Sequence, residues 1–240
     1  MGASGSGGAR TAAGPTLDRP VRVAGSACER RGGVGPDLLP VGRRPRRRRR
    51  LAKTLVGPPT LQPRRARPRL GCGAGEDALL LSRWGFRVVA VDFSGKALEL
   101  TGRRAPEAET EHVDLTQGLP FPDAHFGAIV ASLSLHYFPW SETLEILEDV
   151  QRCLAPGGHL LSRLNSTNDP HYAAAHREEI GPNFYLVDSS PTRLFDREDV
   201  VALFRPDWKM VDAVERASGR YGDEKTLWEI VARKPAGRGP

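Results

Sequence analysis

The chain has 240 residues, of which 39% are hydrophobic and 27% charged. No apolar run approaches the ~18 residues that cross a bilayer and no signal peptide is seen, so we expect a cytoplasmic protein without a membrane span. The three cysteines, Cys28, Cys72 and Cys153, are scattered, which excludes a disulfide framework or a zinc site of cysteines.

Charge divides the chain near residue 69. Residues 1–69 carry 17 basic and three acidic side chains, a net +14, and contain no Phe, Trp or Tyr. Residues 70–240 carry a net −8. We therefore predict an Arg-, Pro- and Gly-rich leader over residues 1–69 and a domain over residues 70–240, which is long enough for one packed core.

Three interpretations of the leader remain open. Its arginine run at residues 46–50 could neutralise phosphates as a basic arm, although no aromatic residues are present to stack on bases. The composition also fits a disordered, solvated tail. A displaced reading frame is favoured over both, because Arg, Pro, Gly and Ala have the GC-rich codons that a wrong frame in a GC-rich gene produces.

The domain begins with a glycine turn, Gly71-Cys72-Gly73-Ala74-Gly75. Glycines at every second position let main-chain N–H groups and a ligand approach closely. An apolar run at residues 86–91 then ends in Asp92, where a carboxylate can accept both hydroxyls of a ribose. Turn, helix, strand and terminal acid in this order predict a nucleoside site.

The residues after the turn favour a cofactor without phosphate. A dinucleotide fingerprint places its third glycine where this chain has Glu76. Glu76 and Asp77 would also repel a phosphate at the start of the following helix. An NAD(P)-dependent oxidoreductase is therefore kept only as an alternative.

The remaining pattern is that of strands alternating with helices. Helices are expected at residues 78–81, closed by Gly85, and at 96–104 and 141–154, with strands at 86–91, 111–115, 128–133 and 159–164. A Pro-Gly-Gly turn at residues 156–158 precedes the last of these strands, and residues 208–214 and 226–231 form an antiparallel pair. Asp196 is expected to cap a further helix.

From Leu70 to about Lys234 the chain resembles the class I S-adenosylmethionine-dependent methyltransferases. The resemblance rests on the glycine turn, the acid ending the next strand, the Pro-Gly-Gly turn and the C-terminal hairpin. It implies an α/β fold, a doubly wound, Rossmann-like and mostly parallel sheet that ends in an antiparallel hairpin, with S-adenosyl-L-methionine as cofactor. The cofactor-binding residues that it implies are Gly71, Cys72, Gly73, Ala74, Gly75, Asp92, Phe93, Asp114, Leu115 and Ser132, with Asp114 at the adenine.

Upstream of Leu70 the resemblance stops. The family has Val-Leu-Asp-Leu-Gly where this chain has Arg67-Pro68-Arg69-Leu70-Gly71, so we expect a degraded first strand. One base restored before the codon of Leu70 permits Val-Leu-Asp-Leu-Gly to be read, which supports the displaced frame. Because Arg69 replaces an acid that holds the methionine end of the cofactor, weak or absent cofactor binding is predicted.

The acceptor should lie beyond strands four and five, near His136 and residues 165–169. His136 is the candidate general base, with Tyr137 beside it; alternatively both cap the sheet and pack on Trp140. Residues 171–190 either cover the acceptor site or form a surface loop.

A small-molecule methyl acceptor is predicted. No Asn-Pro-Pro-Tyr or Asp-Pro-Pro-Tyr follows strand four, which argues against methylation of adenine N6 or glutamine N5 and makes nucleic acid unfavoured. The six histidines show no ligand spacing, so no metal is expected. The sequence makes no prediction of acceptor identity or oligomeric state.

Overall fold

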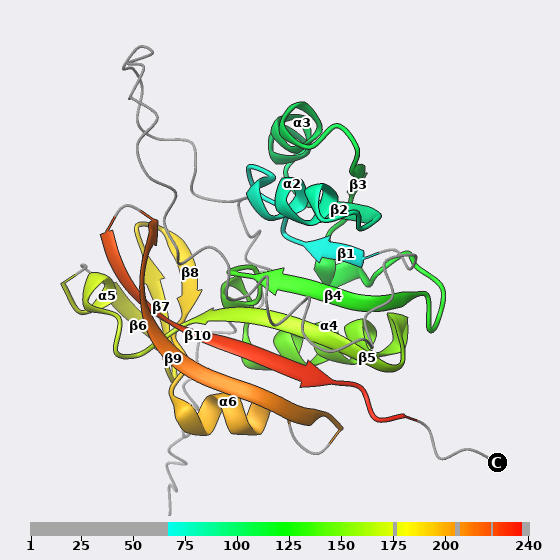
Figure 1. The fold of residues 1–240 in the computed structure, drawn as a ribbon. Helices are drawn as coiled ribbons and strands as arrows, with labels where there is room; N and C mark the ends of the chain where they lie inside the picture. The colour runs from blue at the N-terminus through cyan, green and yellow to red at the C-terminus, as the bar shows by residue number, and fades with distance from the viewer. Residues whose placement is uncertain (1–66, 175–176, 205–206, 222, 237–240) are drawn as a thin grey trace, which may run out of the picture.

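The computed structural model describes residues 67–174, 177–204, 207–221 and 223–236 (Figure 1). Residues 1–66 of the leader, on which its three interpretations depend, lie outside the described residues. A seven-stranded sheet has the order β3-β2-β1-β4-β5-β10-β9. Its strands are β1 (Arg67–Leu70), β2 (Val88–Asp92), β3 (Glu109–His112), β4 (Phe126–Ser132), β5 (Leu154–Asn165), β9 (Lys209–Tyr221) and β10 (Asp223–Arg233). The first five are parallel and the last two form an antiparallel hairpin on β5, which confirms the predicted fold class.

Helices cover both faces of this sheet. They are α2 (Glu76–Arg83), α3 (Gly95–Arg104), α4 (Trp140–Cys153) and α6 (Arg197–Leu203), with the 3-10 turns η2 (Leu115–Gln117) and η3 (Leu135–Tyr137). Val89 and Val91 of β2 pack in the core that α4 and α6 complete, whereas Val88 and Ala90 pack in the core that α2 completes. This alternation is why the apolar runs of the sequence form strands buried on both faces.

The first strand corrects one expectation. Arg67-Pro68-Arg69-Leu70 is a strand, and it lies centrally, parallel to both β2 and β4. Pro68 is only the second residue of β1, and pairing with β4 begins at Arg69, so the missing N–H falls near the strand end. The first strand is therefore present, and the expected degradation is seen only in its short length of four residues.

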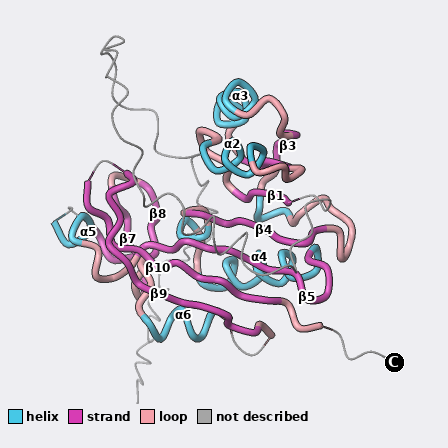
Figure 2. The backbone as a smooth tube through the Cα atoms, in the orientation of Figure 1, coloured by secondary structure: helices cyan, strands magenta, loops and turns pink. Residues whose placement is uncertain are grey.

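A second, small sheet lies beyond the carboxyl ends of β4 and β5 (Figure 2). It comprises β6 (Arg177–Gly181), β7 (Phe184–Val187) and β8 (Ser190–Arg193), and follows the short helix α5 (Pro170–Ala174). Asp188 and Ser189 both have positive φ, 48° and 66°, as a two-residue hairpin turn requires. The segment expected to cover the acceptor site or to form a loop is therefore an ordered antiparallel sheet.

Arg193 fastens this small sheet to the main domain. Its side chain is 5% exposed and its guanidinium carbon lies 5.6 Å from the Trp140 ring centroid and 4.7 Å from that of Phe184. It donates hydrogen bonds to the carbonyls of Phe138 and Pro182. Carbonyl oxygens and aromatic faces compensate a buried cation, so the sheet is held against η3.

None of the helices in the described ranges is long and apolar enough to cross a membrane.

Candidate functional site

The glycine turn follows β1 and has little room for side chains. Gly71, Gly73 and Gly75 have φ of 62°, 52° and 77°, a region that side chains rarely adopt. A Cβ at Gly71 would lie 2.6 Å from the Cβ of Ser134, and one at Gly75 would lie 2.8 Å from the Cα of Thr101. A Cβ at Gly73 would meet no atom within 4 Å. The outer two glycines thus serve packing, and Gly73 leaves bare main chain beside open space.

Asp92, at the end of β2, lies against this turn. Its Oδ2 accepts a hydrogen bond of 2.9 Å from the Gly73 N–H, and its Oδ1 accepts one of 2.9 Å from the Ser94 N–H. Ser94 in turn caps α3 by accepting from the Ala97 N–H. A carboxylate has about four lone-pair sites, so each oxygen can accept a further hydroxyl. The carboxylate is therefore oriented by the main chain and keeps capacity for a diol.

Thr101 of α3 fixes the turn from behind and was not singled out from the sequence. Its side chain is fully buried, and its hydroxyl donates to the Gly73 carbonyl at 3.1 Å and lies 3.2 Å from the Cys72 sulfur. Cys72 is 2% exposed, so it fills space beneath the turn. The sequence carries no signal for this role, because a threonine in a helix is usually exposed.

The other cofactor-binding residues predicted from the resemblance flank Asp92. Phe93 is 48% exposed, with its ring centroid 5.8 Å from that of His112. Asp114 begins η2 by accepting from both the N–H and the hydroxyl of Thr116. Leu115 is partly buried against the core. These side chains follow β2 and β3, next to each other at one edge of the sheet.

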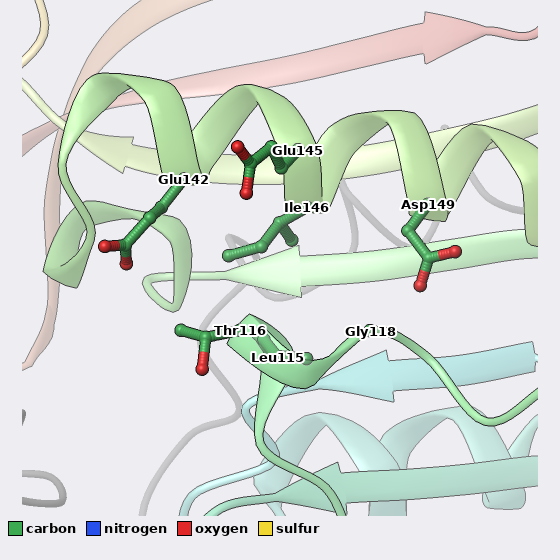
Figure 3. A pocket seen from close by; sticks show the side chains of 7 residues that line it. All are labelled: Leu115, Thr116, Gly118, Glu142, Glu145, Ile146 and Asp149. Atoms are coloured by element: carbon green, nitrogen blue, oxygen red, sulfur yellow. The ribbon is translucent and has the colours of Figure 1, made fainter.

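A cavity of about 220 Å³ lies between η2 and α4 (Figure 3). It is lined by Leu115, Thr116, Gly118, Glu142, Glu145, Ile146 and Asp149. Burial, and then the charges of Glu145 and Asp114, raise the pKa of Glu142. No group of three His, Cys, Asp or Glu side chains in the described part of the chain is placed to hold a metal ion. The cavity includes neither the glycine turn nor Asp92, and Leu115 is the one lining residue that it shares with the predicted cofactor-binding residues.

The strand order reverses between β1 and β4, and ligands of open α/β sheets bind at such a switch point. Here Gly71 faces the loop after β4. Leu133 in that loop has φ of 55°, a strained conformation for a branched side chain that is typical of functional sites. Ser132, just before it, is 8% exposed and its Oγ accepts a hydrogen bond from Arg163 of β5.

His136 and Tyr137 lie on η3, beyond this loop. The ring centroids of His136 and Tyr137 are 4.0 Å apart, and His136 is 5% exposed. Burial, reinforced by the charge of Lys225, lowers the pKa of His136 from 6.5 to about 3. Tyr137 and Trp140 both pack on the same core cluster. His136 is consequently neutral at physiological pH and able to accept a hydrogen bond.

Comparison with known proteins gives consistent matches. A family described as "Methyltransferase domain" matches residues 69–158. The 27-O-demethylrifamycin SV methyltransferase of Amycolatopsis mediterranei is 34% identical over 207 residues, covering 76% of this chain and 72% of that protein. An uncharacterized methyltransferase of Synechocystis sp. is 35% identical over 89 residues, 37% of this chain and 42% of its own length.

The fold has solved counterparts. A SAM-dependent methyltransferase of Methanosarcina mazei superposes with a TM-score of 0.66 at 22% identity, covering 73% of this chain and 95% of that one. The matched part of this chain thus contains nearly the whole fold of that protein.

Proposed function

This chain belongs to the class I S-adenosylmethionine-dependent methyltransferases, and from that premise we propose that it methylates a small molecule. The rifamycin methyltransferase to which it is similar is named for a small acceptor. The net charge of −8 over residues 70–240 would repel a phosphate backbone, which supports the same class. The family assignment also replaces the nicotinamide oxidoreductase considered from the sequence.

The observation that carries the proposal is the hydrogen bond between the Gly73 N–H and Asp92. It sets a carboxylate with free lone pairs beside an open, side-chain-free stretch of main chain. This geometry fits the adenosine of S-adenosylmethionine, with Asp92 on the ribose hydroxyls and Asp114 on the adenine. Residues 71–75, Phe93, Leu115 and Ser132 would surround it, as the family resemblance implies.

When bound, the cofactor supplies a methyl group already activated by the positive sulfonium. The chain's own residues need chiefly to hold the acceptor in line, and such alignment can supply about 7–11 kcal/mol. We propose that His136 accepts a hydrogen bond from the acceptor and that Tyr137 packs beside it. With a pKa near 3, His136 would orient the acceptor more effectively than it would remove a proton.

A paired binding experiment tests the function. The full chain and a variant carrying Arg67→Val, Pro68→Leu and Arg69→Asp are screened by thermal shift with S-adenosylhomocysteine and with NADH. We expect S-adenosylhomocysteine to stabilise the variant by several degrees and the unmodified chain less, with no effect of NADH. Stabilisation by NADH alone would contradict the proposal. Steeply salt-dependent DNA binding, lost on removal of residues 1–66, which leaves β1 intact, would instead favour the basic-arm alternative.

A further inference from the structure

Polar side chains from four elements gather beyond the carboxyl ends of β4 and β5. They are His136 of η3, Asn165 at the end of β5, Asp169, Tyr172 of α5 and Lys225 of β10. Asn165, Asp169 and Tyr172 are 0%, 1% and 8% exposed. We call these five residues the polar cluster. Burying polar groups in the interior costs free energy unless they form hydrogen bonds or ion pairs.

Lys225 and Tyr172 form the fixed side of the polar cluster. The Lys225 Nζ donates to the Tyr172 hydroxyl at 3.2 Å and lies 5.0 Å from the centroid of its ring. Burial lowers the pKa of Lys225, and the charge of Asp169 opposes this effect. Burial also raises the pKa of Tyr172, with Tyr137 and Asp169 adding to the rise. The cation, the phenol and the carboxylate therefore share one buried environment.

Asp169 and His136 each leave one buried atom unpaired within the described structure. The Asp169 Oδ1 accepts from the His171 N–H at 3.0 Å, whereas its Oδ2 has no partner among the described residues. The Nδ1 of His136 is likewise without one there. The Asn165 amide lowers the pKa of the nearby Tyr172 hydroxyl but completes no hydrogen bond of ordinary geometry. An unpaired buried polar atom costs about 1–3 kcal/mol. The Asp169 oxygen therefore suits a ligand that donates to it, and the His136 nitrogen suits a polar group of the ligand.

The position of these atoms relative to the glycine turn indicates which kind of ligand would reach them. Ser134, whose Oγ is also buried and unpaired in the described part, contacts the glycine turn, and His136 follows it by two residues. Asp169 follows β5, the next strand along the sheet. Both unpaired atoms therefore lie on the side of the cofactor turn where ligands of doubly wound sheets bind.

Resting on the proposed methyltransferase function, we propose that the polar cluster binds an acceptor bearing a hydroxyl or amine, and that the free Asp169 oxygen receives its proton. His136 accepts or orients a second polar group of the same molecule. During transfer the acceptor oxygen or nitrogen bonds to the methyl carbon, and the carbon–sulfur bond breaks with its electron pair staying on sulfur. The acceptor proton passes to the Asp169 Oδ2 and then to solvent.

The test measures binding of 1-naphthol, 1-naphthylamine and naphthalene by ligand-observed NMR titration, with and without S-adenosylhomocysteine. The full chain is compared with Asp169→Asn, His136→Gln and the matched control Asp212→Asn, whose side chain is exposed on β9. We expect the full chain and the control to bind a donor-bearing ring about tenfold more tightly than naphthalene, as one charged hydrogen bond allows. Asp169→Asn should remove most of that preference, and whether naphthol or naphthylamine is preferred separates hydroxyl from amine acceptors.

Equal binding of all three rings to the full chain, or a preference that survives in Asp169→Asn, would overturn the proposal. If Asp169→Asn fails to fold by circular dichroism, Asp169→Ser decides the same question, because its hydroxyl can still accept from the His171 N–H but offers no second carboxylate oxygen, and a donor preference retained there contradicts the site. His136→Gln leaves the Asp169 Oδ2 in place and should keep the preference for these single-donor rings. Failure of S-adenosylhomocysteine to bind concerns the proposed function instead. The preference for a donor-bearing ring is also measured without S-adenosylhomocysteine, so the two proposals are judged separately.

Discussion

The Asp92 carboxylate joins the Gly73 N–H to the Ser94 N–H, one through each of its oxygens. The two bonds tie the glycine turn after β1 to the end of β2 and to the cap of α3. Both donors belong to the main chain, so the carboxylate is held in one orientation without depending on a mobile side chain. The proposed diol site would therefore need no reorientation of Asp92 to receive its ligand.

Asp92→Asn should weaken S-adenosylhomocysteine binding about 10- to 100-fold, because an amide has one acceptor oxygen and must set its NH₂ against one of the two N–H groups. Isothermal titration calorimetry measures the change, ideally in the variant with the family's first strand restored. Asp212→Asn makes the same chemical change at an exposed position and should bind normally. Unchanged affinity in Asp92→Asn would remove Asp92 from the site.

Two glycines of the turn should respond differently to alanine. In Gly75→Ala the new Cβ would fall 2.8 Å from the Thr101 Cα, a backbone atom, so we expect a loss of several degrees in Tm. In Gly73→Ala only the φ of 52° is unfavourable, at about 1–2 kcal/mol, and the methyl group enters open space.

Gly73→Ala should therefore lose ligand affinity by a larger factor than Gly75→Ala relative to its loss of stability. Urea unfolding and calorimetry on the two variants give both quantities. The opposite order, with Gly73→Ala the less stable protein and ligand binding intact, would show that Gly73 serves packing.

Local patterns in the sequence predicted the sheet and the glycine turn. These patterns are the apolar runs, the turn ending near Gly75 and the acid at residue 92. Each determines the structure of a few neighbouring residues or of one strand. Asp196 also begins α6 as expected, in a reciprocal capping box with Asp199. The parts that depend on such short-range chemistry were predictable.

Contacts between distant parts of the chain were not. Thr101 reaches Gly73 across 28 residues, and Lys225 reaches Tyr172 across 53. Neither pair has a sequence signature, since a threonine in a helix and a lysine in a hairpin are usually exposed. Asp169 was recognised only as part of a loop. It is 1% exposed, accepts a hydrogen bond from the His171 N–H of α5 and acts electrostatically on Lys225 of β10.

The short strands depend on their partners in the same way. The sequence of β1 contains proline and two arginines, and it becomes a strand because β2 and β4 are paired on either side. The turn expected at residues 156–158 is absorbed into β5, which starts at Leu154 directly after α4. Gly157 there has φ of 74°, and the register shifts between Phe126 and Ala128 of β4. At such positions pairing with neighbouring strands decides the structure, and the strand propensity of the individual residues does not.

Acid should destabilise the protein through His136. Its pKa is about 3 in the folded chain and 6.5 when unfolded, so between these values the unfolded chain binds the extra proton. Stability then falls as the pH falls below 6.5, by up to about 1.4 kcal/mol per pH unit from this residue, and the loss ends near pH 3. His136→Gln should show a shallower decline in urea-unfolding free energy between pH 6.5 and 4.5. His125→Gln, at an exposed histidine, should follow the parent, and parallel curves for all three would contradict the burial of His136.

Arg69 lies in β1 two residues before Gly71, opposite Ala90 and Val130. The family resemblance implies an acid here that holds the methionine end of the cofactor. A cation in its place would repel the sulfonium and ammonium groups, whereas a carboxylate would attract them. Arg69→Asp should therefore tighten S-adenosylmethionine binding at least about tenfold, and more than it tightens binding of the uncharged thioether product. Arg64→Asp changes the charge equally from outside the described residues and should alter neither affinity. A low-micromolar Kd of the unmodified chain for S-adenosylmethionine would show that Arg69 does not impair the site. Resequencing codons 60–75 of the gene would show independently whether a base is missing there.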